Sequence, residues 1–268
     1  MLKTLATTAV LIVAVSRVSV LPQSQPLTIS ADFSEGDLAN LSYRYFRGRA
    51  DGTTSPALLG SGAIDIENDR ILGGSELLAS RSIRYATYPS LYPRFYGEVG
   101  LVIGTTLPQN DAHFLHVWTH ESSGWRLLVA HFASLAPNHR EPSMVLGGPP
   151  GPLDSDVAER DQVKAVEGRR LEALAQRRYA DYRQLFAMEY FAVTQAGAAG
   201  PKEIFEDLAG GVHFVNDLDV RIVGAVAIVR GSEGDGPHRL RFTRVWVRRT
   251  GEYMCVAEAL TPAPPLGT

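Results

Sequence analysis

A long internal repeat is the feature that most constrains the fold of this chain. The segment from Phe114 to Leu135 reads FLHVWTHESSGWRLLVAHFASL, and the segment from Phe242 to Leu260 reads FTRVWVRRTGEYMCVAEAL. Each starts with an aromatic residue, has a Val-Trp pair three residues later, and passes through a glycine-containing turn into a second apolar stretch. A period of this length indicates a duplicated domain and not a solenoid of short repeats.

Two spacings describe the repeat. Trp118 and Trp246 are 128 residues apart, whereas Gly124 and Gly251 are 127 apart. The similarity extends upstream, where GEVGLVIGTT and GAVAIVRGSE are again separated by 127 residues. A chain of 268 residues has room for two domains of about 110 to 130 residues each.

The N-terminus is typical of an export signal. Lys3 precedes an apolar run from Leu5 to Val15, which is shorter than the roughly 20 residues that a membrane span needs. Small residues then allow cleavage after Ser16. We expect residues 1–20 to be a signal peptide and the protein to be secreted or periplasmic. If the segment is not cleaved, it would anchor the protein in the membrane, and no other membrane contact is expected.

Residues 21–137 are predicted to form a first domain whose opening helices are weak. Asp37 to Phe46 favours a short helix capped by Asp37, and Ala63 to Leu72 favours a β-hairpin. Ile83 to Tyr88 favours a strand that Pro89 and Pro93 then interrupt.

A Pro- and Gly-rich linker is expected at 138–156, followed by a second domain at 157–262 and a disordered tail at 263–268. The second domain shows helical periodicity first and four alternating segments later. The order predicts an α+β fold with two cone-like domains. Each would be a curved antiparallel sheet covered by helices, with the first copy degenerate.

This order of helices and strands, together with the Val-Trp and glycine-turn pattern, resembles the nuclear transport factor 2-like cone fold. Among its members, the SnoaL-like and domain of unknown function 4440 types are the most similar. The resemblance covers Val157 to Pro262 well and Leu72 to Pro137 in part. The fold includes isomerases, dehydratases and cyclases as well as non-catalytic binding and association modules, so it does not choose a function.

The ketosteroid isomerases of this fold offer a test by residue. They use an Asp base, a helix Tyr and a second acid to form and stabilise an enolate. In the second copy these positions fall on Thr194, Arg170 and Thr243, and in the first copy the central-strand position falls on Leu115. None of the groups is retained, so the sequence predicts no catalytic residue of this kind.

The same overlay predicts which side chains line a ligand pocket, and it pairs His131 with Glu258 at matching positions 127 residues apart. Alternation would send Trp118, Trp246 and Arg244 to the opposite face, where they would pair the sheets. The predicted ligand-binding residues are Tyr190, Thr194, Arg241, Thr243, Glu258 and His131, and the overlay adds His113, Leu115, Val117, Val129, Val245 and Val256 to the pocket face.

Other chemistries find little support. His116 and His120 would share one strand face while His113 points away, so no metal site and no cofactor are predicted. Cys255 has no partner for a disulfide and reads as a small core residue. Arg241, Arg244, Arg248 and Arg249 favour a solvated or ion-paired edge, and a net charge of −3 argues against nucleic acid.

Two functions remain open at this stage. The first is a non-catalytic module that binds a small apolar ligand or associates through its sheets, as an intrachain pseudo-dimer or a homodimer. The alternative is an isomerase, lyase or cyclase acting on a small, largely apolar substrate with Glu258 or His131 as the acid-base group.

Overall fold

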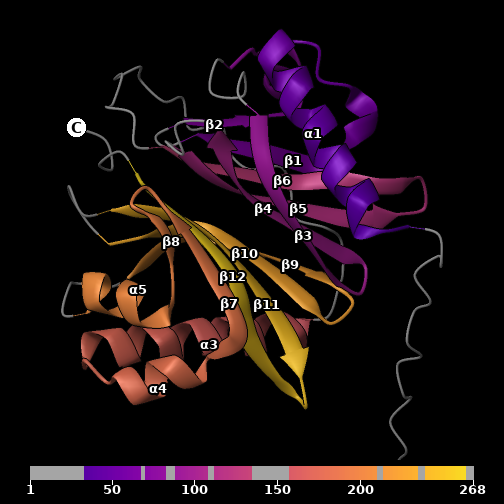
Figure 1. Cartoon of the computed structure of the whole chain (residues 1–268). Coiled ribbons are helices and arrows are strands. Elements are labelled where there is room, and N and C mark those ends of the chain that lie inside the picture. Colours follow the sequence, from indigo (N-terminus) through magenta and orange to yellow (C-terminus); the bar gives the residue numbers. More distant parts are fainter. Residues whose placement is uncertain are drawn as a thin grey trace, which may run out of the picture.

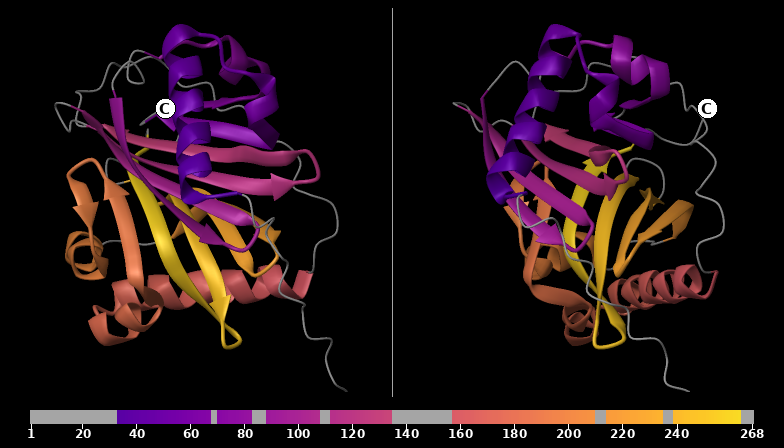
Figure 2. Two further views of the ribbon diagram at one scale, coloured as in Figure 1. Left: turned by 45° about the vertical axis from the view of Figure 1, so that its right-hand side comes forward. Right: turned by 90° about the vertical axis from the view of Figure 1, so that its right-hand side faces the viewer.

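The computed structural model describes residues 33–67, 70–82, 88–107, 112–134, 157–209, 214–234 and 239–263. In this part of the chain two six-stranded sheets lie against each other, and helices cover the outer face of each sheet (Figures 1 and 2). The predicted α+β class with two cone-like halves is confirmed. The predicted signal peptide, the 138–156 linker, most of the Ile83 strand and residues 264–268 lie outside the described residues.

The first half contains one long helix, one six-stranded sheet and short helical segments. Its elements are α1 (Glu35–Asp51), the 3-10 helix η1 (Pro56–Leu58), β1 (Leu59–Glu67), β2 (Arg70–Gly73), α2 (Gly74–Ala79), β3 (Tyr88–Tyr96), β4 (Val99–Leu107), β5 (Ala112–Glu121) and β6 (Gly124–Ser134). The strand order in the sheet is β2-β1-β6-β5-β4-β3.

The second half repeats this plan. Its elements are α3 (Val157–Ala175), α4 (Tyr179–Gln184), β7 (Phe186–Thr194), β8 (Gly197–Ala199), α5 (Pro201–Leu208), β9 (Val215–Val223), β10 (Val226–Glu233), β11 (Leu240–Arg249) and β12 (Glu252–Pro262). The strand order β8-β7-β12-β11-β10-β9 is the order of the first sheet with each strand replaced by its counterpart. In each sheet one pair is parallel, β1 with β6 and β7 with β12, and the other pairs are antiparallel.

The first half is not degenerate at its start, contrary to the sequence-based prediction. Helix α1 has 17 residues, and its cap is Ser34, not Asp37. Ser34 and Asp37 form a reciprocal capping box, which satisfies the free N–H groups of the first turn. The weak apolar periodicity of this helix hid its length, because charged and small residues share its buried face.

Two strands also differ from the prediction. Pro89 and Pro93 do not end a strand but lie within β3, which is the edge strand of its sheet, where a missing N–H costs no ladder bond. The stretch at 197–199, expected to be a turn, forms β8 and pairs with β7. At the C-terminus β12 extends through Thr261 and Pro262.

The predicted orientation of the sheet faces is reversed in the structure. Trp118 and Trp246 are fully buried beneath the helices of their own halves, and do not lie between the sheets. The Nε1–H of Trp118 donates to Ser42 Oγ on α1 at 2.9 Å, and the Nε1–H of Trp246 donates to Glu167 Oε1 on α3 at 2.9 Å. The repeated tryptophan therefore fixes each helix to its sheet.

The other face of each sheet forms a shared apolar layer between the halves. This layer contains, among others, Leu115, Val117 and Val129 from the first half and Val245, Val256 and Ala259 from the second half. Polar contacts surround it, since Arg94 donates to the Glu189 carbonyl at 3.1 Å and Arg221 donates to the Ser61 carbonyl at 2.9 Å. The two sheets are thus held by one continuous core layer.

Strand pairing explains the reversed faces. The β5–β6 and β11–β12 hairpins match at a spacing of 128 residues along both strands, which equates Ala130 with Glu258 and His131 with Ala259. Both hairpins have a two-residue turn, but the glycine aligned in sequence is the first residue of β6 in one and lies inside the turn in the other. Aligning Gly124 with Gly251 therefore slips the register by one residue, which moves every side chain to the wrong face.

The shared layer predicts that the halves unfold together. Truncating fully buried Leu115 to Ala should lower the free energy of unfolding by about 2–5 kcal/mol, because it leaves a cavity between the sheets. Urea denaturation followed by circular dichroism should show one transition in both proteins. As a matched control, Met188→Ala removes an apolar side chain that is 95% exposed and should change the value by less than about 0.5 kcal/mol. Two separate transitions in the wild type would contradict a shared core.

Candidate functional site

The interior of the second half holds a buried network of charged side chains. Arg244 lies on β11 and Arg170 on α3, and both side chains are fully buried. The sheet and the helix supply their acidic partners, which are Glu167 on α3, Glu233 on β10 and Glu258 on β12. We call these five residues the charged core.

Arg244 is the centre of the charged core. Its Nη1 lies 3.1 Å from Glu167 and its Nη2 lies 3.0 Å from Glu233, while its Nε donates to Glu258. Arg170 pairs with Glu167 at 3.0 Å and donates through Nη2 to Glu233. Because each arginine contacts at least two carboxylates, the charges compensate one another away from water.

Two tyrosines lie next to Glu258. The hydroxyl of Tyr190 donates to Glu258 Oε2 at 2.6 Å. Burial, followed by the charge of Glu258, raises the pKa of Tyr190 and of Tyr182 well above its usual value. Both phenols therefore stay protonated at ordinary pH, and that of Tyr190 serves as a hydrogen-bond donor to the carboxylate.

Electrostatics keep the core carboxylates ionised. Burial raises the pKa of Glu233, but the adjacent Arg170 and Arg244 guanidinium groups outweigh this and bring it to about 2. For Arg244, burial lowers the pKa, while Glu167, Glu233 and Glu258 outweigh it and raise the pKa well above its usual value. Such a network is suited to fixing side-chain positions, because neither partner is ready to exchange a proton near neutral pH.

The first half has a smaller polar interior with a different arrangement. Arg49 on α1 donates to Asp65 Oδ2 at 2.8 Å and to Glu67 Oε1 at 2.6 Å, both on β1. Tyr45 donates to the same Asp65 oxygen at 2.7 Å. The register places Asp65 opposite Ala130, and Ala192 opposite Glu258, so the interior acid has moved from one parallel strand to the other.

His116 occupies the position of Arg244 in the first half. It is fully buried, and neither ring nitrogen has a hydrogen-bond partner among the described residues. The rings of Tyr45, Phe46 and Phe114 lie 4.8–5.5 Å from it. Burial lowers its pKa to about 3, so the imidazole is neutral in the folded protein.

The six predicted ligand-binding residues divide between two places. Tyr190 and Glu258 meet inside the second half, as the overlay assumed. Thr194 lies at the end of β7, where its hydroxyl donates to the Gly197 carbonyl at 2.9 Å. His131 and Thr243 do not face a pocket but contact each other between the sheets.

His131 bridges the two sheets. Its Nδ1 lies 3.0 Å from Thr243 Oγ1, and its Nε2 lies 3.0 Å from Thr261 Oγ1. Arg241 acts on the same ring, because burial and then the Arg241 charge lower the pKa of His131 to about 3. The one-residue slip accounts for the placement of all three predicted residues, since period-two alternation reverses their face.

The sequence did not reveal the charged core. Arg244, grouped with Arg248 and Arg249 as a solvated or ion-paired edge, is buried, while the other two form ion pairs with Glu159 and Glu189 near the surface. A signal did exist, because Arg244 alternates with Phe242 and Trp246 on one strand face.

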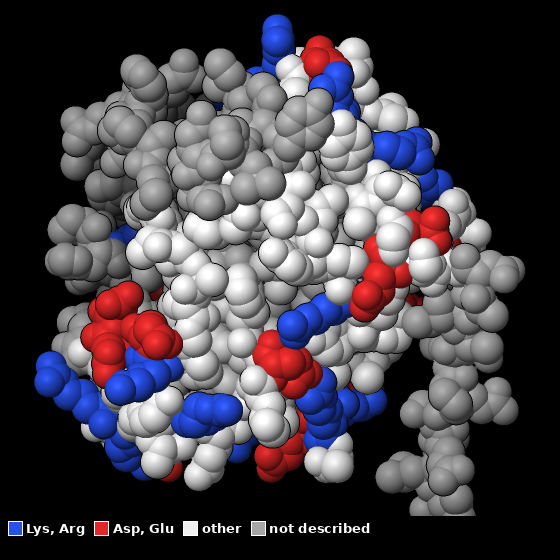
Figure 3. All heavy atoms as spheres, in the orientation of Figure 1, with Lys and Arg blue, Asp and Glu red and all other residues white. Residues whose placement is uncertain are grey.

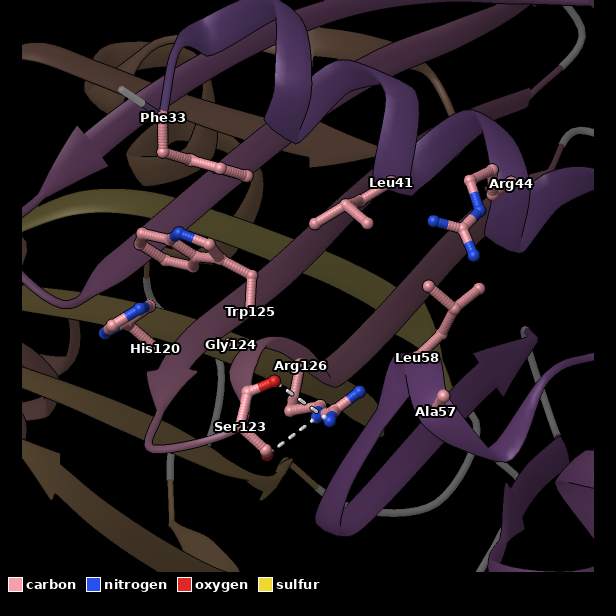
Figure 4. Close-up of a pocket in the computed structure, with 10 residues that line it drawn as sticks. All are labelled: Phe33, Leu41, Arg44, Ala57, Leu58, His120, Ser123, Gly124, Trp125 and Arg126. Carbon is pink, nitrogen blue, oxygen red and sulfur yellow. Dashed lines mark hydrogen bonds between the residues drawn. The ribbon is translucent and has the colours of Figure 1, made fainter. Parts of the chain in front are cut away.

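An open groove lies in the first half, between α1, η1 and the β5–β6 turn. Its volume is about 530 Å³. In Figure 4, Phe33, Trp125 and His120 lie on one side and Arg44 and Leu58 on the other, with Arg126 between them. We call this feature the turn groove, and its lining residues are Phe33, Leu41, Arg44, Ala57, Leu58, His120, Ser123, Gly124, Trp125 and Arg126.

Metal-ligand geometry and membrane-spanning helices were also considered. Among the described residues, no group of three or more His, Cys, Asp or Glu side chains could hold a metal ion. Cys255 is buried, and burial raises the pKa of its thiol well above the usual value. Within the same ranges, no helix has both the length and the apolar character needed to cross a membrane.

Known proteins resemble the chain in structure only. No family model and no curated protein matches the sequence. An NTF2-like protein from Cytophaga hutchinsonii is 16% identical, and the match covers 40% of this chain and 99% of that chain, with a TM-score of 0.35. A protein of unknown function with a cystatin-like fold from Nostoc punctiforme is 13% identical over 42% of this chain and 98% of its own, with a TM-score of 0.37.

The CamKII hub homology domain of Chlamydomonas reinhardtii is 16% identical, and the match covers 39% of this chain and 98% of the hub domain, with a TM-score of 0.35. The predicted resemblance to nuclear transport factor 2-like proteins is confirmed at the level of fold. It rests on two six-stranded sheets that share one strand order, as expected for tandem cone domains. At these identities the likeness describes fold alone.

Glu258 should act as a structural residue. Replacing it with Gln keeps the shape but removes one charge from the charged core, so Arg244 loses an ionic partner. We expect the free energy of unfolding to fall by about 3 kcal/mol in urea denaturation. Glu172→Gln, at a side chain that is 56% exposed, is the matched control and should change it by less than about 0.5 kcal/mol. Equal stability of Glu258→Gln and wild type would contradict the structural role.

His131 should make stability depend on pH. Its pKa falls from 6.5 in the unfolded chain to about 3 in the folded protein, so the unfolded state binds the extra proton first. The stabilisation is therefore complete above pH 6.5 and is lost as pH falls towards 3, at up to about 1.4 kcal/mol per pH unit.

The variant His131→Gln tests this dependence between pH 6.5 and 5, above most carboxylate titrations. We expect a shallower fall in unfolding free energy than in wild type, whereas His120→Gln, at an exposed histidine, should leave the slope unchanged. An unaltered slope in His131→Gln would show that the ring does not couple protonation to folding. His116, also neutral and buried, contributes to the slope that remains.

Proposed function

We propose that the protein is an exported, non-catalytic binding module built from two cone-like halves that pair through their sheets within one chain. Export is supported by Lys3 and the apolar run that follows it. The intrachain pseudo-dimer is supported by the apolar layer that both sheets share.

The observation that carries the non-catalytic assignment is the state of Glu258. This carboxylate is fully buried, and it is engaged by the Arg244 guanidinium and the Tyr190 hydroxyl. A general acid or base must reach the proton that it transfers and have a pKa near the working pH. Glu258 has its proton-accepting oxygens occupied, and the interior position of the second half therefore favours stability over chemistry.

His131, the other acid-base candidate, supports the same proposal. Both ring nitrogens contact threonine hydroxyls between the sheets, and the low pKa of the ring makes it a poor base. The open concavity instead lies on the surface of the first half, in the turn groove. On the face shown in Figure 3, acidic and basic side chains are intermixed, which favours a small-molecule or protein partner over nucleic acid.

The binding assignment predicts that a bound ligand is returned unchanged. Small apolar and amphipathic molecules that raise the melting temperature of the protein would be incubated with it and recovered for mass spectrometry. We expect intact ligand after many hours, because no acid-base group is positioned to react. Conversion that is lost in Glu258→Gln or His131→Gln, while the variant remains folded, would instead support the isomerase, lyase or cyclase alternative.

A further inference from the structure

The turn groove has the chemistry of a binding site for a small organic anion. We propose that it binds a carboxylate attached to a flat, apolar body, with the carboxylate between Arg44 and Arg126 and the body against Trp125. The proposal deepens the binding function argued above and rests on it.

The charge of the groove is the first argument. Its lining contains two arginines and no acidic residue. Within the described chain, neither Arg44 nor Arg126 forms an ion pair, although the neighbouring Arg47 pairs with Asp51 at 3.6 Å. The nearest acid along the strand, Glu121, lies 4.0 Å from Arg221. Two guanidinium groups without carboxylate partners create a site that favours an anion.

Arg126 is already oriented for this role. Its Nε donates to Ser123 Oγ at 3.2 Å and its Nη2 donates to the Ser123 carbonyl at 3.1 Å, which fixes the side chain along the floor of the groove (Figure 4). The remaining guanidinium hydrogens stay available. A pre-oriented planar donor loses less entropy when it binds a carboxylate, which lowers the cost of association.

The apolar wall is the second argument. Trp125 is 7% exposed, and its ring is held by Phe33 in a stacked pair at 5.3 Å and by Phe95 and His120, each also at 5.3 Å. A ring fixed on three sides presents a rigid face for a flat ligand. The volume of about 530 Å³ lies in the range of small-molecule sites, which combine apolar walls with a few oriented polar groups.

The duplicated half lacks this combination, which argues against a general property of the fold. The hairpin register equates Trp125 with Tyr253 and Arg126 with Met254. At the turn itself, Gly124 corresponds to the exposed Glu252, whose charge would repel an anion. The site is therefore specific to the first half.

Isothermal titration calorimetry with 2-naphthoate tests the proposal, and its uncharged analogue 2-naphthamide serves as the ligand control. We expect saturable binding of the carboxylate and at least about tenfold weaker binding of the amide, because only the carboxylate makes charge-assisted bonds to both arginines. Higher salt should weaken binding of the carboxylate further.

Arg44→Ala and Arg126→Ala should each weaken naphthoate binding about tenfold, and Trp125→Leu should weaken both ligands. Arg47→Ala, three residues along α1 and outside the groove, is the matched control and should stay within about twofold of wild type. Circular dichroism checks the fold of each variant. Arg44 is exposed, so its truncation leaves the core intact and keeps the test valid even if Trp125→Leu unfolds.

Each other outcome overturns a stated part. Absence of saturable naphthoate binding, equal binding of the amide, or full binding in Arg44→Ala and Arg126→Ala would refute the carboxylate site. If another compound binds and is returned intact, the binding module stands while this site fails. If naphthoate binds through the two arginines but is chemically converted, the site stands and the non-catalytic assignment fails.

Discussion

Both faces of each six-stranded sheet are apolar in this protein, and the need to bury both is the constraint on which the architecture depends. Helices cover one face, through aromatic clusters around Trp118 and Trp246. The other face is covered only by the opposite sheet. Either half alone would expose a layer of valine, leucine and isoleucine side chains to water, an arrangement that soluble monomers avoid. Joining two copies in one chain meets this need without a second molecule.

The interior beneath the helices is filled differently in the two halves. The first half combines a neutral histidine in an aromatic cluster with a single arginine that contacts two acids. The second half replaces this with five mutually paired charges. Buried ion pairs add little net stability, but removing one partner is expensive, so such a set resists single substitutions. This explains how a cone interior can contain many titratable groups and yet offer no free acid or base among the described residues.

Much of the fold could be predicted from the sequence, because the strands alternate and the duplication repeats Phe, Val and Trp at fixed spacing. Helix α1 was underestimated, since its buried face includes Ser42, Gly48 and Arg49, which carry no apolar signal. The candidate site was harder to predict. Tyr190 and Glu258 were placed correctly, but His131 and Thr243 were assigned to the wrong face because glycine occupies different turn positions in the two hairpins. The partners of buried charges depend on tertiary contacts, which no local pattern encodes.

The contact of His131 with Thr243 and Thr261 has a consequence for the symmetry of the pair. Rotating one half onto the other replaces these three residues with Ala259, Leu115 and Ala133, so the polar cluster on one side of the pseudo-twofold axis is matched by an entirely apolar one on the other. Two identical subunits must present the same patch to each other, which forbids such a difference. Fusion of the copies released the interface from self-complementarity, and each half has since been free to specialise as one side of a lock that neither could form with itself.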